Sequence, residues 1–266
     1  MVGQALPVIA MFWKGSELGW FERLSIHSFL HQGHVVKLFH TDPMDPQIDG
    51  LELVPVQEVY DPPRRLAKNA APSFLADIFR LYLMKKTDYV WMDSDILAVR
   101  PVSVQDGYAI SWSGPNSSGQ INNATLRLPS DSAALDHLLE HIENPEIVPE
   151  WMNADQRRIV EKTPVGRRLL KQGKLLRIVY GPRGLNHALQ KTGEHVHARP
   201  MDVYSPVPWW LSDLFFAPPA GVEAFVSEDT QVVHLFKDQM RKYNARRQPP
   251  EGSYLDLFAK SVGFEG

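Results

Sequence analysis

The stretch Tyr89-Val90-Trp91-Met92-Asp93-Ser94-Asp95-Ile96-Leu97 decides the fold. Its first four residues are apolar or aromatic, which is typical of a short strand buried on both faces of a sheet. The run stops at two carboxylates, and ligands of open α/β sheets bind beyond the carboxyl ends of the strands. Residues two apart in an extended chain point to the same side, so Asp93 and Asp95 can converge on one hard cation while Ser94 turns away. The stretch therefore predicts a buried strand that ends in a metal site.

Two other interpretations of Asp93 and Asp95 stay open. Acidic and small residues favour surface turns, so Asp-x-Asp alone is typical of a solvated turn, although the buried strand before it favours a site. A strand ending in Asp-x-Asp also occurs in Mg²⁺-dependent phosphohydrolases, where the first carboxylate, here Asp93, would be the nucleophile. That motif usually continues with Thr or Val two residues after the second Asp, where this chain has Leu97.

The length and composition fit one large α/β domain. The chain has 266 residues, of which 44% are apolar, and can bury a sizeable core. The formal net charge of -3 excludes the global basic field of a nucleic-acid binder, so we expect no nucleic-acid partner. Cysteine is absent, which excludes disulfides, thiolate metal sites and thiol nucleophiles and suits a reducing compartment.

Strands and helices alternate along the chain, which predicts a mostly parallel sheet. An apolar run at residues 7–13, a helical stripe at 18–30 and a second apolar run at 35–39 form a strand, helix and strand with a right-handed crossover. Further strands are expected at 51–54, 89–92, 108–113, 120–128, 175–180 and 230–233. Further helices are expected at 73–86, 130–142, 149–173 and 185–190.

Polar residues on the predicted elements each allow two interpretations. Asp77 and Arg80 are neighbours on one helix, either as an ordinary ion pair worth a few tenths of a kcal/mol or as site residues. Asn122 and Asn123 can hydrogen-bond sugar hydroxyls or cap turns. His234 ends a predicted strand, where a lone His is more often structural than ligating.

Basic residues follow that histidine. Lys237, Arg241 and Lys242 favour a ligand role for His234, because a metal-bound diphosphate needs a cationic partner that an acidic site does not provide.

The combination resembles the glycosyltransferases with a DXD sugar-binding region. This family includes initiation mannosyltransferases, α-1,4-galactosyltransferases and bacterial capsule or lipo-oligosaccharide sugar transferases. The resemblance rests on residues 73–81 followed by residues 89–95, an Ala-Asp, apolar, Arg helix before a strand that ends in Asp-x-Asp. Weaker support comes from residues 9–15, Asn122-Asn123, Gly181-Pro182 and His234. Lys86-Thr87-Asp88, where members commonly have Gly-Gly, and the bulky Phe79 depart from the pattern.

The resemblance implies a GT-A fold, the Rossmann-like α/β fold of nucleotide-diphospho-sugar transferases, in a single domain over residues 1–266. Residues 1–113 would form the nucleotide-sugar-binding half and residues 114–266 the acceptor-side half. A hexose or N-acetylhexosamine would move from a nucleoside-diphosphate sugar, with UDP favoured and GDP as the second option, to a hydroxyl of a glycan or glycolipid. Mn²⁺ or Mg²⁺ would bridge the diphosphate, and retention of anomeric configuration is favoured. A catalytically inactive nucleotide-sugar-binding protein is an alternative.

The resemblance also implies roles for site residues. The catalytic residues would be Asp93, Asp95, Asn123 and, as a candidate base, Asp155; the metal ligands would be Asp93, Asp95 and His234. The donor nucleotide-sugar would contact Phe12, Trp13, Asp77, Arg80, Ser94, Asn122 and Lys237, with Gln156 as a further sugar contact.

The apolar segment 6–13 is too short for a membrane span and has no basic leader. Golgi members of the family carry a membrane anchor, so the resemblance implies a bacterial, cytoplasmic enzyme for polysaccharide biosynthesis. Trp209-Trp210, Phe215-Phe216 and the basic residues of segment 237–247 suit peripheral contact with the inner face of a membrane. The alternative is that the Trp pair packs in the core or lines an acceptor cleft.

Overall fold

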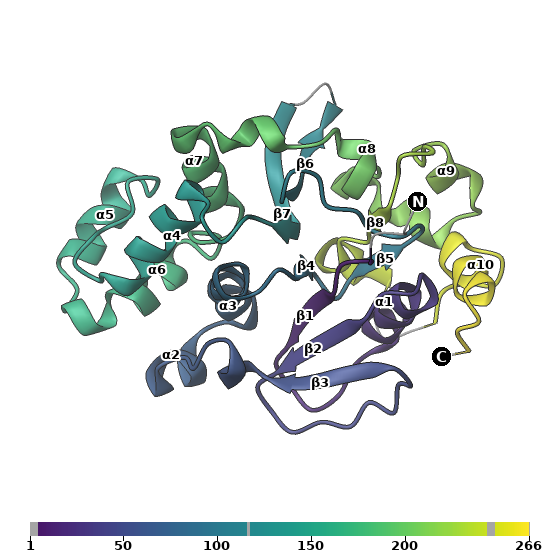
Figure 1. Ribbon diagram of the computed structural model, residues 1–266, viewed down its shortest axis with the longest axis horizontal. Helices are drawn as coiled ribbons and strands as arrows, with labels where there is room; N and C mark the ends of the chain where they lie inside the picture. Colours follow the sequence, from purple (N-terminus) through teal and green to yellow (C-terminus); the bar gives the residue numbers. More distant parts are fainter. Residues whose placement is uncertain (1–4, 116–117, 244–247, 266) are drawn as a thin grey trace.

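A mixed six-stranded sheet forms the centre of the computed structural model, which describes residues 5–115, 118–243 and 248–265 (Figure 1). The strand order is β3-β2-β1-β4-β7-β6. These strands are β1 (Ile9–Trp13), β2 (Val36–His40), β3 (Leu51–Pro55), β4 (Val90–Met92), β6 (Ala109–Gly114) and β7 (Ser118–Arg127). The pairs β1–β2, β2–β3 and β1–β4 are parallel, whereas β4–β7 and β6–β7 are antiparallel. The predicted mostly parallel α/β sheet is confirmed.

Helices flank this sheet (Figure 1). They are α1 (Trp20–His31), α2 (Arg64–Asn69), α3 (Pro72–Lys86), α4 (Ala133–Glu143), α5 (Ala154–Glu161), α6 (Arg168–Leu175), α7 (Pro182–Thr192), α8 (Met201–Tyr204), α9 (Ala220–Glu223) and α10 (Tyr254–Ser261). Short 3-10 segments include η3 (Val165–Arg167), η5 (Trp209–Phe216) and η6 (Lys237–Tyr243). None of the helices in the described residues is long and apolar enough to cross a membrane.

The central strand β4 is buried on both faces, as its sequence predicts. Val90 and Met92 pack in one hydrophobic cluster with Ile9 and Met11 of β1, while Trp91 packs in a second cluster with helix α3. Side chains of successive strand residues point to opposite faces, so a wholly apolar triplet requires cover on both sides. The carboxylates that follow β4 therefore sit at the rim of a doubly covered sheet.

A second, two-stranded sheet brings the C-terminal part of the chain to that rim. Strand β5 (Ile96–Ala98) pairs antiparallel with β8 (Val232–His234), with Ile96 opposite His234. Figure 1 shows β5 and β8 side by side next to the end of β4. Because β5 begins directly after Asp95, this pairing places the late histidine beside the acidic turn.

Two sequence predictions of secondary structure are wrong. Residues 175–180 form the end of α6 and a turn, because the Tyr180 hydroxyl bonds Gln172 Oε1 at 2.7 Å and the Val179 carbonyl accepts from Trp151 Nε1 at 2.6 Å, without a neighbouring strand. The helix expected over 149–173 is divided into α5, η3 and α6, since a proline at 164 lacks the N–H that a helix interior requires. The helix predicted over 73–86 is present as α3, which begins one residue earlier at Pro72.

Candidate functional site

Asp93 and Asp95 lie in the turn that follows β4. The Asp93 N–H donates to the carbonyl of Ala124 at 2.8 Å, which continues the antiparallel β4–β7 pairing by one residue. The side chains of Asp93 and Asp95 are 30% and 18% exposed, so each can reach a ligand from outside the core. Ser94 lies between them and is half-buried.

His234 meets Asp95 across the β5–β8 pair. Its Nε2 lies 3.3 Å from Asp95 Oδ1, while the other Asp95 carboxylate oxygen accepts the Lys237 N–H at 2.9 Å. The Leu235 N–H also donates to the Asp95 carbonyl at 3.0 Å. One ligand atom from each of Asp93, Asp95 and His234 lies within 4.8 Å of the other two. We call these three residues the strand-end centre.

The buried guanidinium of Arg80 contacts this centre from the core side. Arg80 NH2 of α3 lies 3.1 Å from Asp77 Oδ1 and 3.2 Å from Asp93 Oδ1, and its guanidinium covers the Trp91 ring at 4.5 Å. Trp91 Nε1 donates to the same Asp93 oxygen at 2.8 Å. Arg80 and Asp77 are 4% and 5% exposed, so the ion pair that the sequence left ambiguous is buried and reaches Asp93.

Two asparagines of β7 join the network. Asn123 is 6% exposed and donates from Nδ2 to Asp77 Oδ1 at 3.0 Å, while its carbonyl accepts from Arg80 NH1. Asn122 Nδ2 lies 3.4 Å from His234 Nδ1, and Asn122 Oδ1 accepts the Ala124 N–H at 3.0 Å. The sequence treats the two as alike, but Asn123 fixes Asp77 and Asn122 faces the strand-end centre.

The pKa values of the acidic residues diverge. Burial raises the pKa of Asp77 to about 6, although the Arg80 charge opposes the shift. Burial also raises the pKa of Asp93. Burial alone would raise the pKa of Asp95, but the charge and hydrogen bond of His234, with the Lys237 N–H, outweigh it and hold that pKa below its usual value. Burial would lower the pKa of His234, but the adjacent Asp95 raises it.

The strand-end centre has the donors that a hard divalent cation accepts. Carboxylate oxygens suit Mn²⁺ and Mg²⁺, and a neutral imidazole can complete the shell of Mn²⁺. Ligand atoms on one such ion stand about 3–4 Å apart, so the observed spread requires only small side-chain shifts. A cation here would require His234 to be neutral, since only neutral imidazole ligates metals.

A cavity of about 440 Å³ opens beside the centre. Its lining combines amide and hydroxyl side chains with aromatic rings: Asp93, Ser113, Gln120, Ile121, Asn122, Asn123, Pro182, Ser205, Pro208, Trp209, His234 and Phe236. Pro182 opens helix α7, so the N-terminus of that helix meets the cavity. Amides with aromatic rings are suited to a polar ligand that has weakly apolar faces, such as a sugar.

Two predicted nucleotide contacts and the predicted phosphate contact have other partners. Phe12 is 8% exposed and packs on Phe79 with ring centroids 5.5 Å apart, so its ring is part of the core. Trp13 is half-buried and donates from Nε1 to the Glu17 carbonyl at 2.9 Å. The Lys237 ammonium pairs with the buried Glu22 carboxylate, which matches its charge.

Asp155 and Gln156 do not join the strand-end centre. Both lie in the first turn of α5, which Figure 1 shows at one end of the long axis, away from β5 and β8. Asp155 is exposed, and Gln156 caps the helix with Asn153 and donates to the Leu175 carbonyl at 3.2 Å. The structure therefore places the candidate base away from the site and gives Gln156 a local structural role.

The aromatic residues of η5 divide between core and surface. Phe215 is fully buried, whereas Trp209 and Trp210 are 52% and 60% exposed. The Trp pair is therefore not part of the core, and Trp209 lies at the cavity beside the strand-end centre. The side chains of Arg241 and Lys242 and all of residues 244–247 lie outside what the structure describes.

Sequence reasoning gave no site role to two residues that contribute to the site, although Gly181 is among the weaker supports for the family resemblance. The Trp91 indole looks like a core residue in the sequence, yet its N–H holds Asp93. Gly181 precedes α7, and a Cβ there would lie 2.4 Å from Asp77 Oδ2. The only available signals were the indole donor in the acidic strand and a glycine before a proline.

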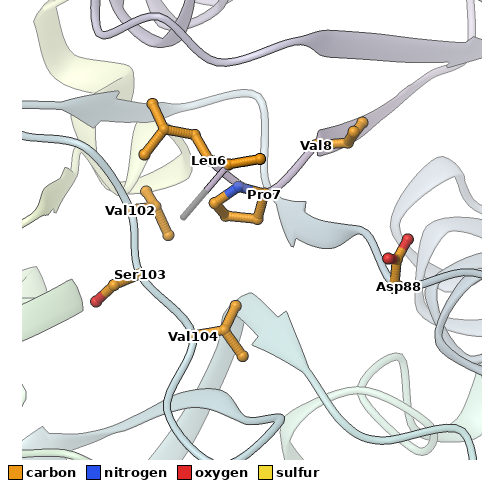
Figure 2. A pocket seen from close by; sticks show the side chains of 8 residues that line it. Leu6, Pro7, Val8, Asp88, Val102, Ser103 and Val104 are labelled. Carbon is orange, nitrogen blue, oxygen red and sulfur yellow. The ribbon is translucent and has the colours of Figure 1, made fainter. Parts of the chain in front are cut away.

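A second cavity of about 380 Å³ lies at the opposite ends of the parallel strands. Figure 2 shows apolar side chains of Leu6, Pro7, Val102 and Val104 around it, with Asp88 as the charged side chain among the labelled residues. It adjoins the amino ends of β1 and β4, where ligands of α/β sheets do not normally bind. Among the described residues that line it, Asp88 and Ser103 carry the polar side chains, which is a poorer donor set than that of the strand-end centre.

Comparisons with known proteins give only a distant likeness. No protein-family profile matches the chain, and no curated protein matches it. Among solved structures, the PaToxG glycosyltransferase has 15% identity and a TM-score of 0.41, over 91% of this chain and 87% of that one. The apo structure of the WbbM bifunctional glycosyltransferase has 10% identity and a TM-score of 0.39, over 98% of this chain and 50% of that one. The chain thus spans about half of WbbM, and likeness at this level does not bear on activity.

Proposed function

We propose that the protein is a metal-dependent glycosyltransferase with a GT-A fold. It moves a hexose or N-acetylhexosamine from a nucleoside-diphosphate sugar, with UDP favoured over GDP, to a hydroxyl of a glycan or glycolipid. One observation carries this proposal: Asp93, Asp95 and His234 converge at the carboxyl rim of a mostly parallel sheet, beside a cavity lined by amides and aromatic rings.

In this proposal Asp93, Asp95 and His234 hold Mn²⁺ or Mg²⁺. Such an ion would supply Lewis-acid stabilisation of a departing diphosphate. Asp95 is fixed on both oxygens, by His234 and by the Lys237 N–H, so it is preorganised as a ligand. Asp93 is held on Oδ1 by Arg80 and Trp91, which orients its carboxylate toward the rim.

The remaining contacts position the donor and the acceptor. Asn122 and Gln120 line the cavity, where their amides can bond sugar hydroxyls, and the Trp209 ring offers a stacking face. Arg80, Asp77 and Asn123 are positioning residues that act through Asp93. Lys237 contacts the diphosphate only if its ion pair with Glu22 opens.

Retention of anomeric configuration is the proposed outcome. An inverting transfer needs a carboxylate or comparable base on the acceptor side of the sugar. Among the described residues that line the cavity, Asp93 is the acidic one, and it belongs to the strand-end centre. The exposed Asp155 on α5 does not supply that base from its observed position.

Donor turnover tests the proposal. Proton NMR of UDP-glucose, UDP-galactose, UDP-N-acetylglucosamine and GDP-mannose with Mg²⁺ would follow slow hydrolysis, and the first anomer released reports retention or inversion. We expect one donor to be consumed only with metal. Release of phosphate from an aryl phosphate by wild type but not by Asp93→Asn, with no donor consumed, would instead favour a phosphohydrolase.

A further inference from the structure

A second three-ligand cluster lies away from the strand-end centre, between helices α4 and α7. His137 belongs to α4, Glu150 to the turn before α5, and His187 to α7. One ligand atom from each lies within 4.8 Å of the other two. Glu150 Oε1 is 2.7 Å from His187 Nε2 and 3.9 Å from His137 Nε2. We call these three residues the imidazole cluster.

One nitrogen of this cluster is buried without a partner. His137 Nε2 is inaccessible to solvent and has no hydrogen bond among the described residues. A buried polar atom without a partner normally costs free energy, so its lone pair or proton is expected to serve a ligand. This nitrogen lies 3.9 Å from the same Glu150 oxygen that His187 and Lys191 contact. A cation bound to that oxygen could therefore also bind the nitrogen.

The imidazole rings are held in place before any ligand arrives. Trp151 packs against His137, His141 and His187 with ring centroids 5.9, 4.8 and 5.1 Å away. The Trp151 indole is itself fixed by donation from Nε1 to the Val179 carbonyl at 2.6 Å. Rings that are ordered in advance lose little conformational freedom on binding, which favours affinity.

Access to the cluster comes from a polar cavity of about 470 Å³. Glu150, Trp151 and His187 line it, and so does Gln120, which also lines the cavity of the strand-end centre. The cluster is therefore open to solvent on one side, as a three-ligand metal site with a bound water requires.

A cation already occupies part of this space. The Lys191 ammonium lies 2.8 Å from Glu150 Oε1, on a side chain that is 49% exposed. Because the side chain is long and half in water, it can leave at small cost. Arg183 also lines the cavity. The positive charges of Lys191 and Arg183 oppose a metal ion, so its binding must come from direct coordination by the imidazole cluster.

We propose that His137, Glu150 and His187 bind one Zn²⁺ ion, with the metal replacing the Lys191 ammonium on Glu150. Two imidazoles and one carboxylate form a donor set that zinc accepts in three-ligand sites. The ion would join α4, α7 and the intervening turn. This proposal does not rest on the proposed sugar transfer.

The test is zinc binding by the full chain at pH 7.5, measured by competition with a chromophoric chelator. We expect a site with a Kd below about 1 µM in wild type and in Asp95→Asn, which removes the other cluster. His187→Ala and Glu150→Gln should weaken it by at least about 100-fold, more than loss of an outer contact costs. His31→Ala, at an exposed histidine of α1, is the matched control and should bind as wild type does.

Lys191→Met separates a metal site from an ordinary ion-pair network. If zinc displaces the ammonium, this variant should bind zinc about tenfold more tightly, because a competing charge is gone. Co²⁺ should give a visible absorption band in wild type that His187→Ala lacks. Equal zinc affinity in wild type, His187→Ala and Glu150→Gln, or no site tighter than about 10 µM in wild type, would overturn the proposal.

Discussion

The strand-end centre and the imidazole cluster, two of the three-ligand clusters among the described residues, are built in opposite ways. The strand-end centre has two carboxylates and one imidazole on the turn after β4 and the end of β8, supported by the buried Arg80. The imidazole cluster has two imidazoles and one carboxylate on α4, α7 and a turn, with the half-exposed Lys191 beside it. The first suits a hard cation that works on phosphate oxygens, and the second suits zinc.

The difference lies in what holds each carboxylate. Asp93 pairs with Arg80, whose side chain is 5% exposed and lies inside the protein. Glu150 is bound by a cation that is 49% exposed, at the surface. Similar contact distances therefore have different energetic weight, since water screens the second pair and not the first.

The largest expected difference between the clusters is in the free energy of unfolding when the cation beside each cluster, Arg80 or Lys191, is removed. Arg80→Met leaves Asp77 and Asp93 without their buried partner and should lower the free energy of unfolding by about 3–5 kcal/mol. Lys191→Met removes an exposed partner and should change it by less than about 0.5 kcal/mol. Urea denaturation at pH 7 measures both. Equal losses in the two variants would show that burial does not distinguish the ion pairs.

Donor turnover should depend on the ligands of the strand-end centre and not on His187 or Asp155. Asp95→Asn should reduce donor turnover by about 100- to 1,000-fold, equivalent to about 2.7–4 kcal/mol. His187→Ala and Asp155→Asn should turn over the donor as wild type does, because neither residue lies at that centre. Initial rates with saturating metal test this, and full activity in Asp95→Asn would exclude the proposed role of Asp95.

Helix α7 carries His187 of the imidazole cluster, and Gly181, the residue before this helix, lies against Asp77 next to the strand-end centre. In Gly181→Ala the new Cβ would meet Asp77 Oδ2 at 2.4 Å, which should cost about 1–3 kcal/mol of stability and reduce donor turnover. Gly166→Ala is the matched control, because no heavy atom lies within 4 Å of its Cβ position. Thermal unfolding of the two variants should differ in Tm, and an unchanged Gly181→Ala would contradict the close approach of α7.

Ionisation of Asp77 should contribute to the pH dependence of the free energy of unfolding. Its pKa is raised to about 6 in the folded protein, so the folded state binds the proton more tightly than the unfolded state, whose pKa is near 3.8. Stability is then greatest below the unfolded pKa and falls by about 2 kcal/mol as pH rises to about 6. Asp77→Asn should lack this fall in urea denaturation between pH 4 and pH 7. A variant with the same slope as wild type would assign the effect to another group.

The position of Asp93 and Asp95 at the rim of the sheet could be predicted from the sequence, because its cause is local. An apolar triplet that stops at two carboxylates specifies a buried strand and its rim, and α3 before it carries Asp77 and Arg80 at neighbouring positions. The placement of His234 beside Asp95 depends on the β5–β8 pairing across more than a hundred residues. Only the family resemblance indicated it.

Other features were beyond the sequence because they depend on tertiary contacts. The pairing of Lys237 with Glu22 joins residues at opposite ends of the chain, so a phosphate contact was the natural expectation for a free lysine. Asp155 is a reasonable base from the sequence alone, but α5 lies away from the strand-end centre. His137, Glu150 and His187 have no motif spacing, and residues 175–180 are apolar enough for a strand but find no strand neighbour.

The central claim is that the strand-end centre binds a nucleotide diphosphate through a divalent cation. Isothermal titration of UDP and GDP, with and without Mn²⁺, tests it on wild type, Asp95→Asn and His187→Ala. The account predicts that one nucleotide binds only with Mn²⁺, that Asp95→Asn abolishes this binding, and that His187→Ala retains it. Binding of neither nucleotide to wild type, or binding that needs no metal and survives in Asp95→Asn, would contradict the account.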